Sequence, residues 1–270
     1  MKLNDLHSLT DNFKSTSKYP VLFIGHGSPM NAIENNIYTQ KWKELGSDLP
    51  KPRAILCISA HWLTHGTWVT AMDKPRTIHD FGGFPEELFK QQYPAPGAPQ
   101  LAEELSSLVA QPTIGMDYDW GLDHGTWSVL LPMYPDAEIP VYQLSIDYYQ
   151  PLEYHYNLAK QLKSLRDKGI LIIGSGNIVH NLRALRYDHK LYDWTQEFDS
   201  HIAQWVEEGN DQAIIQFQKL GKVAEMAHPT YDHFIPLLYT IGLKDDKDNF
   251  SFFNESFEYG ALSMRSIIYA

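Results

Sequence analysis

Short apolar runs alternate with longer amphipathic segments along this chain, which favours an α/β fold with a largely parallel sheet. The apolar runs interpreted as strands, the last two as late or edge strands, cover residues 21–24, 54–59, 67–71, 141–145, 170–173, 250–253 and 263–269. Helical periodicity is clearest at residues 99–110, 151–166, 192–207 and 234–241. Residues 73–96 are rich in proline, glycine and aromatic side chains and are interpreted as a long loop folded over the body. We therefore predict a central, mostly parallel sheet flanked by helices.

No shift in composition divides the chain, so residues 1–270 are predicted to form one domain. The net charge is −11 and no stretch concentrates Lys and Arg, which argues against nucleic acid or an anionic membrane as a partner. No apolar run approaches the roughly 18 residues of a membrane span, and the N-terminus has no signal-peptide core. We expect a cytoplasmic monomer or homodimer. Its one cysteine, Cys57 in AILCIS, is expected to be a buried apolar side chain.

The histidines are unevenly placed. Four of the 12 follow predicted strands or lie in adjoining glycine-containing loops, namely His26 in IGHGSP, His61 in ISAHW, His124 in LDHGTW and His180 in GSGNIVH. A further pair, His228 and His233, straddles the start of a predicted helix. Ligands of open α/β sheets bind beyond the carboxyl ends of the strands, so the four are expected to converge there. Neutral imidazole is a common ligand of Zn, Fe and Cu, but on spacing alone a metal site and ordinary loop histidines both remain open.

The other histidines receive no functional assignment. His7, His155, His189 and His201 lie in polar or helical surface contexts, and His65 and His79 are ambiguous.

Five segments together carry a family resemblance. In chain order they are GHGSPMNA, SAHW, GLDHGTW, GSGNIVHNL and HPTYDHFIPLLY, spanning residues 21 to about 240. They resemble the 4,5-DOPA extradiol dioxygenase branch of the class III (LigB-type) ring-cleavage dioxygenases. The resemblance implies a metal held by His26, His61 and His233, with His180 close enough to be a fourth ligand. Protocatechuate-type enzymes use two histidines and a carboxylate, whereas an all-histidine set suits Zn at least as well as Fe(II).

The resemblance also implies a reaction. One divalent metal ion per chain is expected, zinc as isolated and Fe(II) for turnover, with a catechol such as 4,5-DOPA and O2 as substrates and a ring-opened semialdehyde as product. His180 is expected to act as general base for a catechol hydroxyl, and His124 to bind the substrate and protonate an oxygen-derived intermediate. Trp62, Trp127 and Tyr231 flank the motif histidines and are expected to line the substrate pocket or to pack in the core.

Two other functions remain open. A zinc hydrolase would use the same three histidines to activate water, although no well-placed glutamate accompanies them. A non-catalytic metal or small-molecule binding protein would keep the pocket, although it would have no need of His124 and His180 as proton-transfer groups. Asp123 and Asp232 each precede a motif histidine and either accept an imidazole N–H or occupy exposed or helix-N-terminal positions.

Overall fold

Four parallel strands form the centre of the main sheet. The computed structural model describes residues 18–188 and 190–270, so His7 and His189 lie outside the described residues. Within this part of the chain the main sheet has six strands in the order β6-β2-β8-β1-β12-β9. They are β1 (Val21–Gly25), β2 (Ala54–Ser59), β6 (Val141–Gln143), β8 (Ile170–Gly176), β9 (Phe250–Phe253) and β12 (Ser266–Tyr269). The first four are parallel, whereas β12 runs antiparallel to both of its neighbours. The predicted fold class is confirmed.

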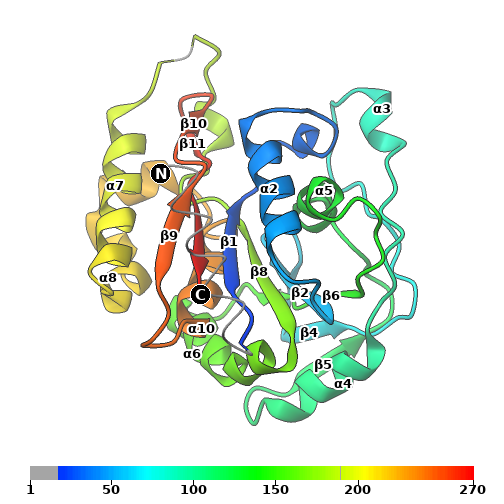
Figure 1. Ribbon diagram of the computed structural model, residues 1–270. Coiled ribbons are helices and arrows are strands. Elements are labelled where there is room, and N and C mark those ends of the chain that lie inside the picture. Colours follow the sequence, from blue (N-terminus) through cyan, green and yellow to red (C-terminus); the bar gives the residue numbers. More distant parts are fainter. Residues whose placement is uncertain (1–17, 189) are drawn as a thin grey trace.

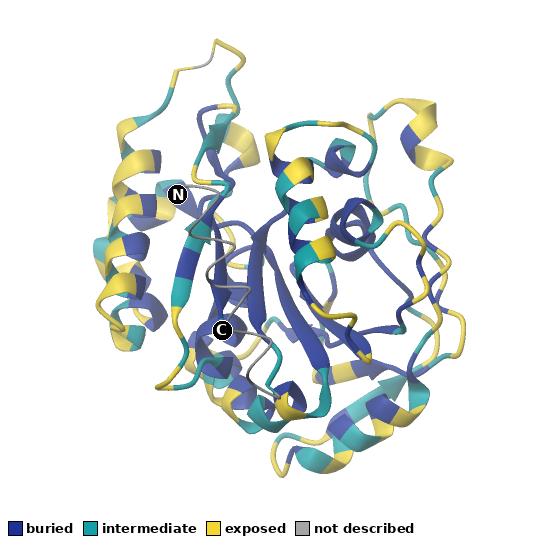
Figure 2. Cartoon of the chain, viewed as in Figure 1, coloured by how far each residue is buried: buried dark blue, intermediate teal, exposed yellow. Residues whose placement is uncertain are grey.

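Helices cover both faces of the sheet (Figure 1). The longer ones are α2 (Ile37–Asp48), α4 (Pro99–Leu108), α5 (His124–Met133), α6 (Leu152–Gln161), α7 (Asp193–Glu207) and α10 (Ile235–Leu243). Along β1, Val21 and Phe23 pack in the core with α6 and α10, whereas Leu22 and Ile24 pack in the core with α2 and α5. Because both faces are buried, as the dark strands of Figure 2 show, the parallel strands read in the sequence as unbroken apolar runs.

Shorter elements complete the described chain. They are α3 (Glu86–Phe89), α8 (Asp211–Ile215), α9 (Lys222–Ala227), β3 (Leu63–Thr64), β4 (Thr67–Thr70), β5 (Ile114–Asp117), β7 (Ile146–Asp147), β10 (Phe257–Glu258) and β11 (Leu262–Ser263). Four 3-10 helices cover Pro29–Ala32, Lys163–Lys168, Leu182–Ala184 and Phe217–Leu220. The predicted strand at 67–71 is present as β4, but it pairs with β5 outside the main sheet. The predicted strand at 263–269 is divided between β11 and β12.

Two of the longer helices were not expected from periodicity. Helix α5 is buried on nearly all sides and contains Pro132, so it lacks the polar face that marks an amphipathic helix. Helix α2 begins at a capping box in which Asn36 and Thr39 satisfy each other's backbone N–H groups. His124, expected in a loop, is consequently the first residue of α5.

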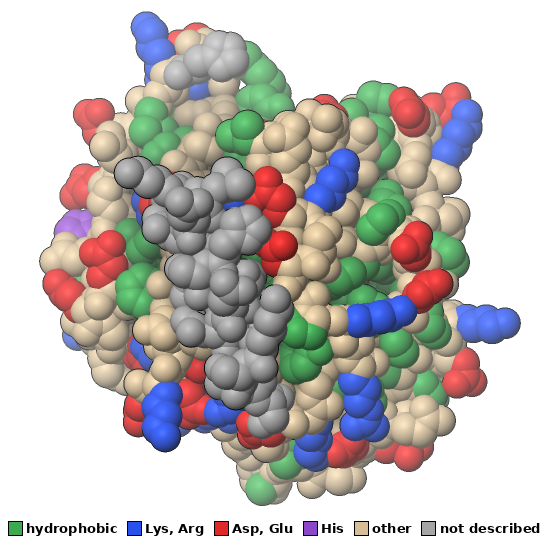
Figure 3. Space-filling view, viewed as in Figure 1, with side chains coloured by type: hydrophobic (Ala, Val, Ile, Leu, Met, Phe, Trp, Pro, Cys, Tyr) green, Lys and Arg blue, Asp and Glu red, His purple; other side chains and the backbone are tan. Residues whose placement is uncertain are grey.

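Cys57 is buried and free, as predicted, and burial raises the pKa of its thiol. On the face shown in Figure 3, acidic and basic side chains are interspersed. Among the described residues, no helix has both the length and the apolar character needed to cross a membrane.

Candidate active site

Five histidines meet at one cavity beyond the carboxyl ends of the central parallel strands. The cavity has a volume of about 430 Å³, and its lining includes His26, His61, His124, His180 and His233. His26 directly follows β1, His61 follows β2 by two residues, and His180 follows β8 by four. His124 begins α5 and His233 lies two residues before α10. The parallel sheet therefore gathers side chains that are distant in the sequence.

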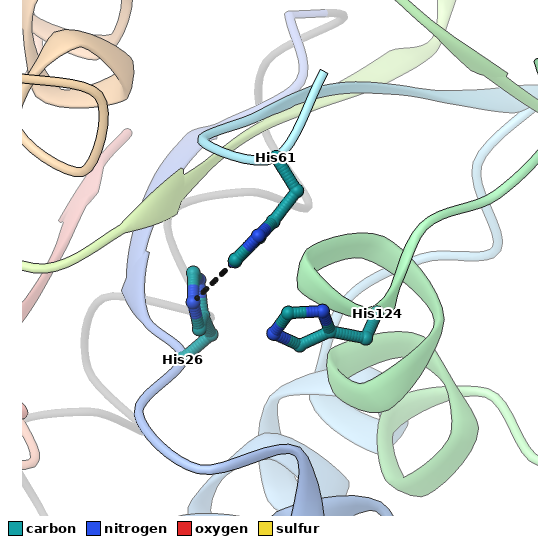
Figure 4. A group of neighbouring side chains, drawn as sticks. All are labelled: His26, His61 and His124. Atoms are coloured by element: carbon teal, nitrogen blue, oxygen red, sulfur yellow. Dashed lines mark hydrogen bonds between the residues drawn. The ribbon is translucent and has the colours of Figure 1, made fainter. Parts of the chain in front are cut away.

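Three of the rings form a nearly equilateral triangle. The ring centroids are 5.1 Å apart for His26 and His61, 5.2 Å for His26 and His233, and 4.9 Å for His61 and His233. The Nε2 atoms of His26 and His61 lie 3.2 Å apart, the contact drawn as a dashed line in Figure 4. Two imidazole nitrogens that each lie about 2.1 Å from one ion are roughly 3–3.5 Å apart. The observed separation is compatible with such an ion.

A hydrogen bond at Nδ1 fixes the orientation of the His26 ring. Its Nδ1 lies 3.0 Å from Ser175 Oγ, and the Ser175 hydroxyl donates to the carbonyl oxygen of Gly125 at 2.5 Å. Since the hydroxyl hydrogen is used in that bond, Ser175 accepts from His26 Nδ1–H. The Nε2 atom of His26 is then left with a free lone pair.

A carboxylate from the long loop holds two histidines. Asp80 accepts hydrogen bonds from the backbone N–H and from Nδ1 of His124, each at 2.9 Å. Its Oδ2 also lies 3.4 Å from Nδ1 of His61. A carboxylate accepts only, so His124 carries hydrogen on Nδ1 and directs a bare Nε2 away from Asp80. Among the aromatic rings in contact with His124, the ring of His61 is the closest, with centroids 3.8 Å apart.

On the opposite side of the cavity, His233 and His180 stack face to face. Their ring centroids are 3.4 Å apart and the planes differ by 4°. His233 Nδ1 contacts the Asp232 carboxylate. Two groups of three side chains could each hold a metal ion, because in each group one potential ligand atom per residue lies within 4.8 Å of the others. The groups are His26, His61 and His124, and His180, Asp232 and His233.

Four of the five cavity histidines, His26, His61, His180 and His233, are held neutral. Burial, and then the neighbouring histidines, lower the pKa values of His26 and His233 well below the usual range. Burial is also the main cause for His61, whose pKa is about 3, and for His180, whose pKa is about 4. Although burial alone would raise the pKa of Asp80, the hydrogen bond from His124 and the nearby imidazoles lower it overall. Neutral imidazoles beside an ionised carboxylate are the protonation states that metal binding requires.

Comparison with known proteins assigns the family. The model of the family described as the catalytic LigB subunit of aromatic ring-opening dioxygenase matches residues 20–266. The chain belongs to the LigB family.

Named relatives lie within the same family. A 4,5-DOPA dioxygenase extradiol of Escherichia coli (strain K12) is 44% identical over 95% of this chain and 97% of its own length. One of Beta vulgaris is 35% identical, over 95% of this chain and 96% of its own length. The crystal structure of an uncharacterized protein from Escherichia coli K12 superposes with a TM-score of 0.81 at 39% identity, covering 94% of this chain and 100% of that one. This LigB chain is thus an extradiol ring-opening dioxygenase, of a family whose members use a metal.

In this LigB chain the apolar walls of the cavity are formed by residues other than the three aromatic residues expected. Phe81 and Phe84 from the 73–96 loop face the cavity, with Leu182, Leu185 and Leu262. The loop does fold over the site, as its composition suggested.

None of the three expected aromatic residues is among the lining residues. Trp62 stacks on Trp120 with planes 6° apart. Trp127 is fully buried and donates its indole N–H to the carbonyl oxygen of Ile78, and Tyr231 is 36% exposed.

The two aspartates next to motif histidines differ in role. Asp232 contacts the imidazole of His233, as an outer-shell carboxylate would. Asp123 instead caps α5 by accepting from the backbone N–H of Thr126 at 3.2 Å, and it is also bound by Ser59 and Gln143. The residues that sequence reasoning missed are Asp80 and Ser175. Asp80 lies within the 73–96 loop and Ser175 near the end of β8, but no spacing rule connects either residue to a histidine.

Proposed function

We propose that this chain is a metal-dependent extradiol dioxygenase that opens the ring of a catechol, with DOPA as the first candidate substrate, because curated relatives with that name are up to 44% identical to it. His26, His61 and His233 would hold one divalent ion, and His124 and His180 would handle protons. The observation that carries the proposal is the orientation of the ring nitrogens. His26 and His61 face each other with Nε2 atoms 3.2 Å apart, Ser175 occupies Nδ1 of His26, and the Asp80 carboxylate lies 3.4 Å from Nδ1 of His61.

If both rings carry hydrogen on Nδ1, the two Nε2 lone pairs face each other, and they repel unless a cation lies between them. The lowered pKa values of both rings argue against a shared proton as that cation. A divalent ion resolves the repulsion, and the third ring of the triangle, His233, is oriented by Asp232 in the manner usual for metal-bound histidine. Three nitrogen ligands suit both Zn and Fe(II). When bound, Fe(II) would supply the electron transfer between the catechol and O2 that side chains cannot perform.

The remaining two histidines face the same cavity and suit proton transfer. His180 is neutral at pH 7, since its pKa is about 4, and it can accept a proton from a catechol hydroxyl. Its ring stacks on the ring of His233, one of the proposed metal ligands. His124 directs Nε2 into the cavity, and the Asp80 carboxylate would stabilise its imidazolium form, so it can take up a proton and return it to a substrate oxygen.

The apolar walls would orient the ring and exclude water. Phe81, Phe84 and the three leucines offer a surface for an aromatic substrate. The hydrolase alternative gains no support, because Asp80 is the one carboxylate among the described residues lining the cavity and it is already bound by His124.

The test is anaerobic reconstitution with Fe(II), followed by addition of DOPA and then O2. We expect O2 uptake that matches the appearance of a yellow semialdehyde. His26→Ala should lose both bound metal and activity, whereas His124→Ala should keep the metal and lose turnover. Tightly bound zinc with no O2 uptake on any catechol, even after iron loading, would favour the hydrolase instead.

A further inference from the structure

The first turn of α5 is connected to two of the cavity histidines. His124 is the first residue of the helix, so its ring moves with the turn. The backbone carbonyl oxygen of the next residue, Gly125, accepts from the Ser175 hydroxyl at 2.5 Å, and Ser175 in turn accepts from Nδ1 of His26. A shift of this turn would therefore displace His124 and disturb the hydrogen bonds that orient His26.

Ser59 ties a third histidine to the same turn. Its hydroxyl donates at 2.6 Å to Oδ1 of Asp123, the residue that caps α5, and its oxygen accepts from the backbone N–H of His61 at 3.2 Å. The packing is tight, because a Cβ at Gly125 would lie 2.4 Å from Ser59 Oγ and 2.9 Å from His61 Cδ2. Figure 4 shows the three rings that meet here, with His124 at the start of the helix.

Gln143 on β6 holds Asp123 with two hydrogen bonds. Its side-chain oxygen accepts from the backbone N–H of Asp123 at 3.1 Å, and its amide NH2 donates to Oδ2 at 2.7 Å. Both residues are fully buried, and Gln143 is not among the described residues that line the histidine cavity. Burial raises the pKa of Asp123, and the hydrogen bonds from Ser59 and Gln143 oppose that rise. Gln143 thus joins the first turn of α5 to the main sheet.

The other two cavity histidines are attached elsewhere. The backbone N–H of His180 donates to the carbonyl oxygen of Ala227, the last residue of α9, and Nδ1 of His233 contacts the Asp232 carboxylate. In the part of the chain that the structure describes, neither histidine forms a hydrogen bond to α5, Ser59 or Gln143. The site therefore has two halves with separate supports.

We propose that Gln143 is a positioning residue for the histidine site. Through Asp123 it fixes the first turn of α5 relative to the sheet. That turn places the rings of His26, His61 and His124. The inference rests on the proposed function for what these rings do, and it goes beyond that function by naming a residue outside the cavity that the activity requires. Without Gln143, a buried carboxylate and a buried N–H lose their partners, and the turn shifts to regain them.

Two variants and one control test this role. Gln143→Leu removes both hydrogen bonds to Asp123 with little change in volume, and Ser59→Ala removes only the connection to His61. In Gln143→Leu, kcat for O2 uptake with DOPA and the affinity for zinc in a competition titration should each fall about tenfold. Gln161→Leu, the same change on α6, breaks two hydrogen bonds to the backbone of residues 110 and 111 outside the cavity and should behave as the wild type.

A spectroscopic readout on the metal-free protein needs neither metal nor turnover. With ¹⁵N in the histidine rings, the NMR signals of the three rings at the α5 turn should shift in Gln143→Leu. The signals of His180 and His233 should stay near their wild-type positions, because their supports are separate. A general loss of packing would instead move all five sets of signals. If Gln143→Leu does not fold, Ser59→Ala carries the test, with the largest shift expected for His61.

Three results would each overturn the inference. They are unchanged signals from the rings at the α5 turn, shifts of equal size in all five rings, and a kcat within about twofold of the wild type in the folded variant. Absence of O2 uptake by the wild type with every catechol would instead overturn the proposed function, and the ring signals would still decide whether Gln143 positions the histidines.

Discussion

Replacing Asp80 by Asn tests whether the long loop positions the catalytic histidine. The amide oxygen can still accept from the backbone N–H of His124, but the amide NH2 cannot accept from Nδ1–H, so the bond of 2.9 Å to the ring is lost. A hydrogen bond to a charged group contributes about 1.5–3 kcal/mol, and the Asp80 side chain is only 18% exposed, so solvent screens it little. If the bond acts in the transition state, kcat should fall about 10- to 100-fold.

The assay is steady-state O2 uptake by the iron-loaded enzyme, with kcat and KM resolved separately and metal content measured on the same samples. Because Asp80 acts through His124, we expect the loss in kcat, with KM changed by less than about threefold. Asp73→Asn, the same change at an exposed position of the same loop, should behave as the wild type. A folded Asp80→Asn enzyme with kcat within about threefold of the wild type would refute the reasoning.

Three further outcomes follow from the geometry. Gly125→Ala places a Cβ 2.4 Å from Ser59 Oγ and 2.9 Å from His61 Cδ2. Because His61 must shift, activity should fall at least about tenfold while the circular dichroism spectrum stays native. Full activity would show that the site tolerates this Cβ. Ser175→Ala removes the acceptor for His26 Nδ1 and should weaken metal binding about tenfold in a competition titration, and an unchanged affinity would count against that role. Burial lowers the pKa of His155 from 6.5 to about 4, so the unfolded chain binds a proton there that the folded chain does not. The contribution of neutral His155 to stability is complete above pH 6.5 and is lost as the pH falls toward 4. In urea unfolding of the metal-free protein, His155→Gln should lower the slope of the unfolding free energy against pH in this window by about 1.4 kcal/mol per pH unit. An undiminished slope would be the contrary result.

Secondary structure was predicted best where burial of an element produces a recognisable pattern of apolar residues along the sequence. Strands buried on both faces appear as unbroken apolar runs, so β1, β2 and β8 were predicted at nearly their observed positions, together with the histidines that follow them. Helix α5 was missed because a helix buried on all sides has no polar face to reveal its period. Consequently His124 was expected in a loop.

Contacts between distant segments left no such signature. Asp80 reaches His124 only because the 73–96 loop folds back over the sheet, and Ser175 reaches His26 because β8 and β1 are neighbours. Trp62 and Trp127 stand next to motif histidines in sequence, but adjacent side chains point in different directions, and neither lines the cavity. The cytoplasmic location and the monomeric or dimeric state stay predictions.

The most direct test of the central claim is to follow isotopically labelled O2 into the product. Iron-loaded enzyme would be mixed with DOPA under ¹⁸O2 and the product analysed by mass spectrometry, with the label in water in a parallel reaction. Ring-opening dioxygenase chemistry predicts that both atoms of O2 enter the ring-opened product before any exchange with water. A product labelled only from water, formed equally well with zinc and without O2, would contradict the account and identify hydrolysis as the reaction.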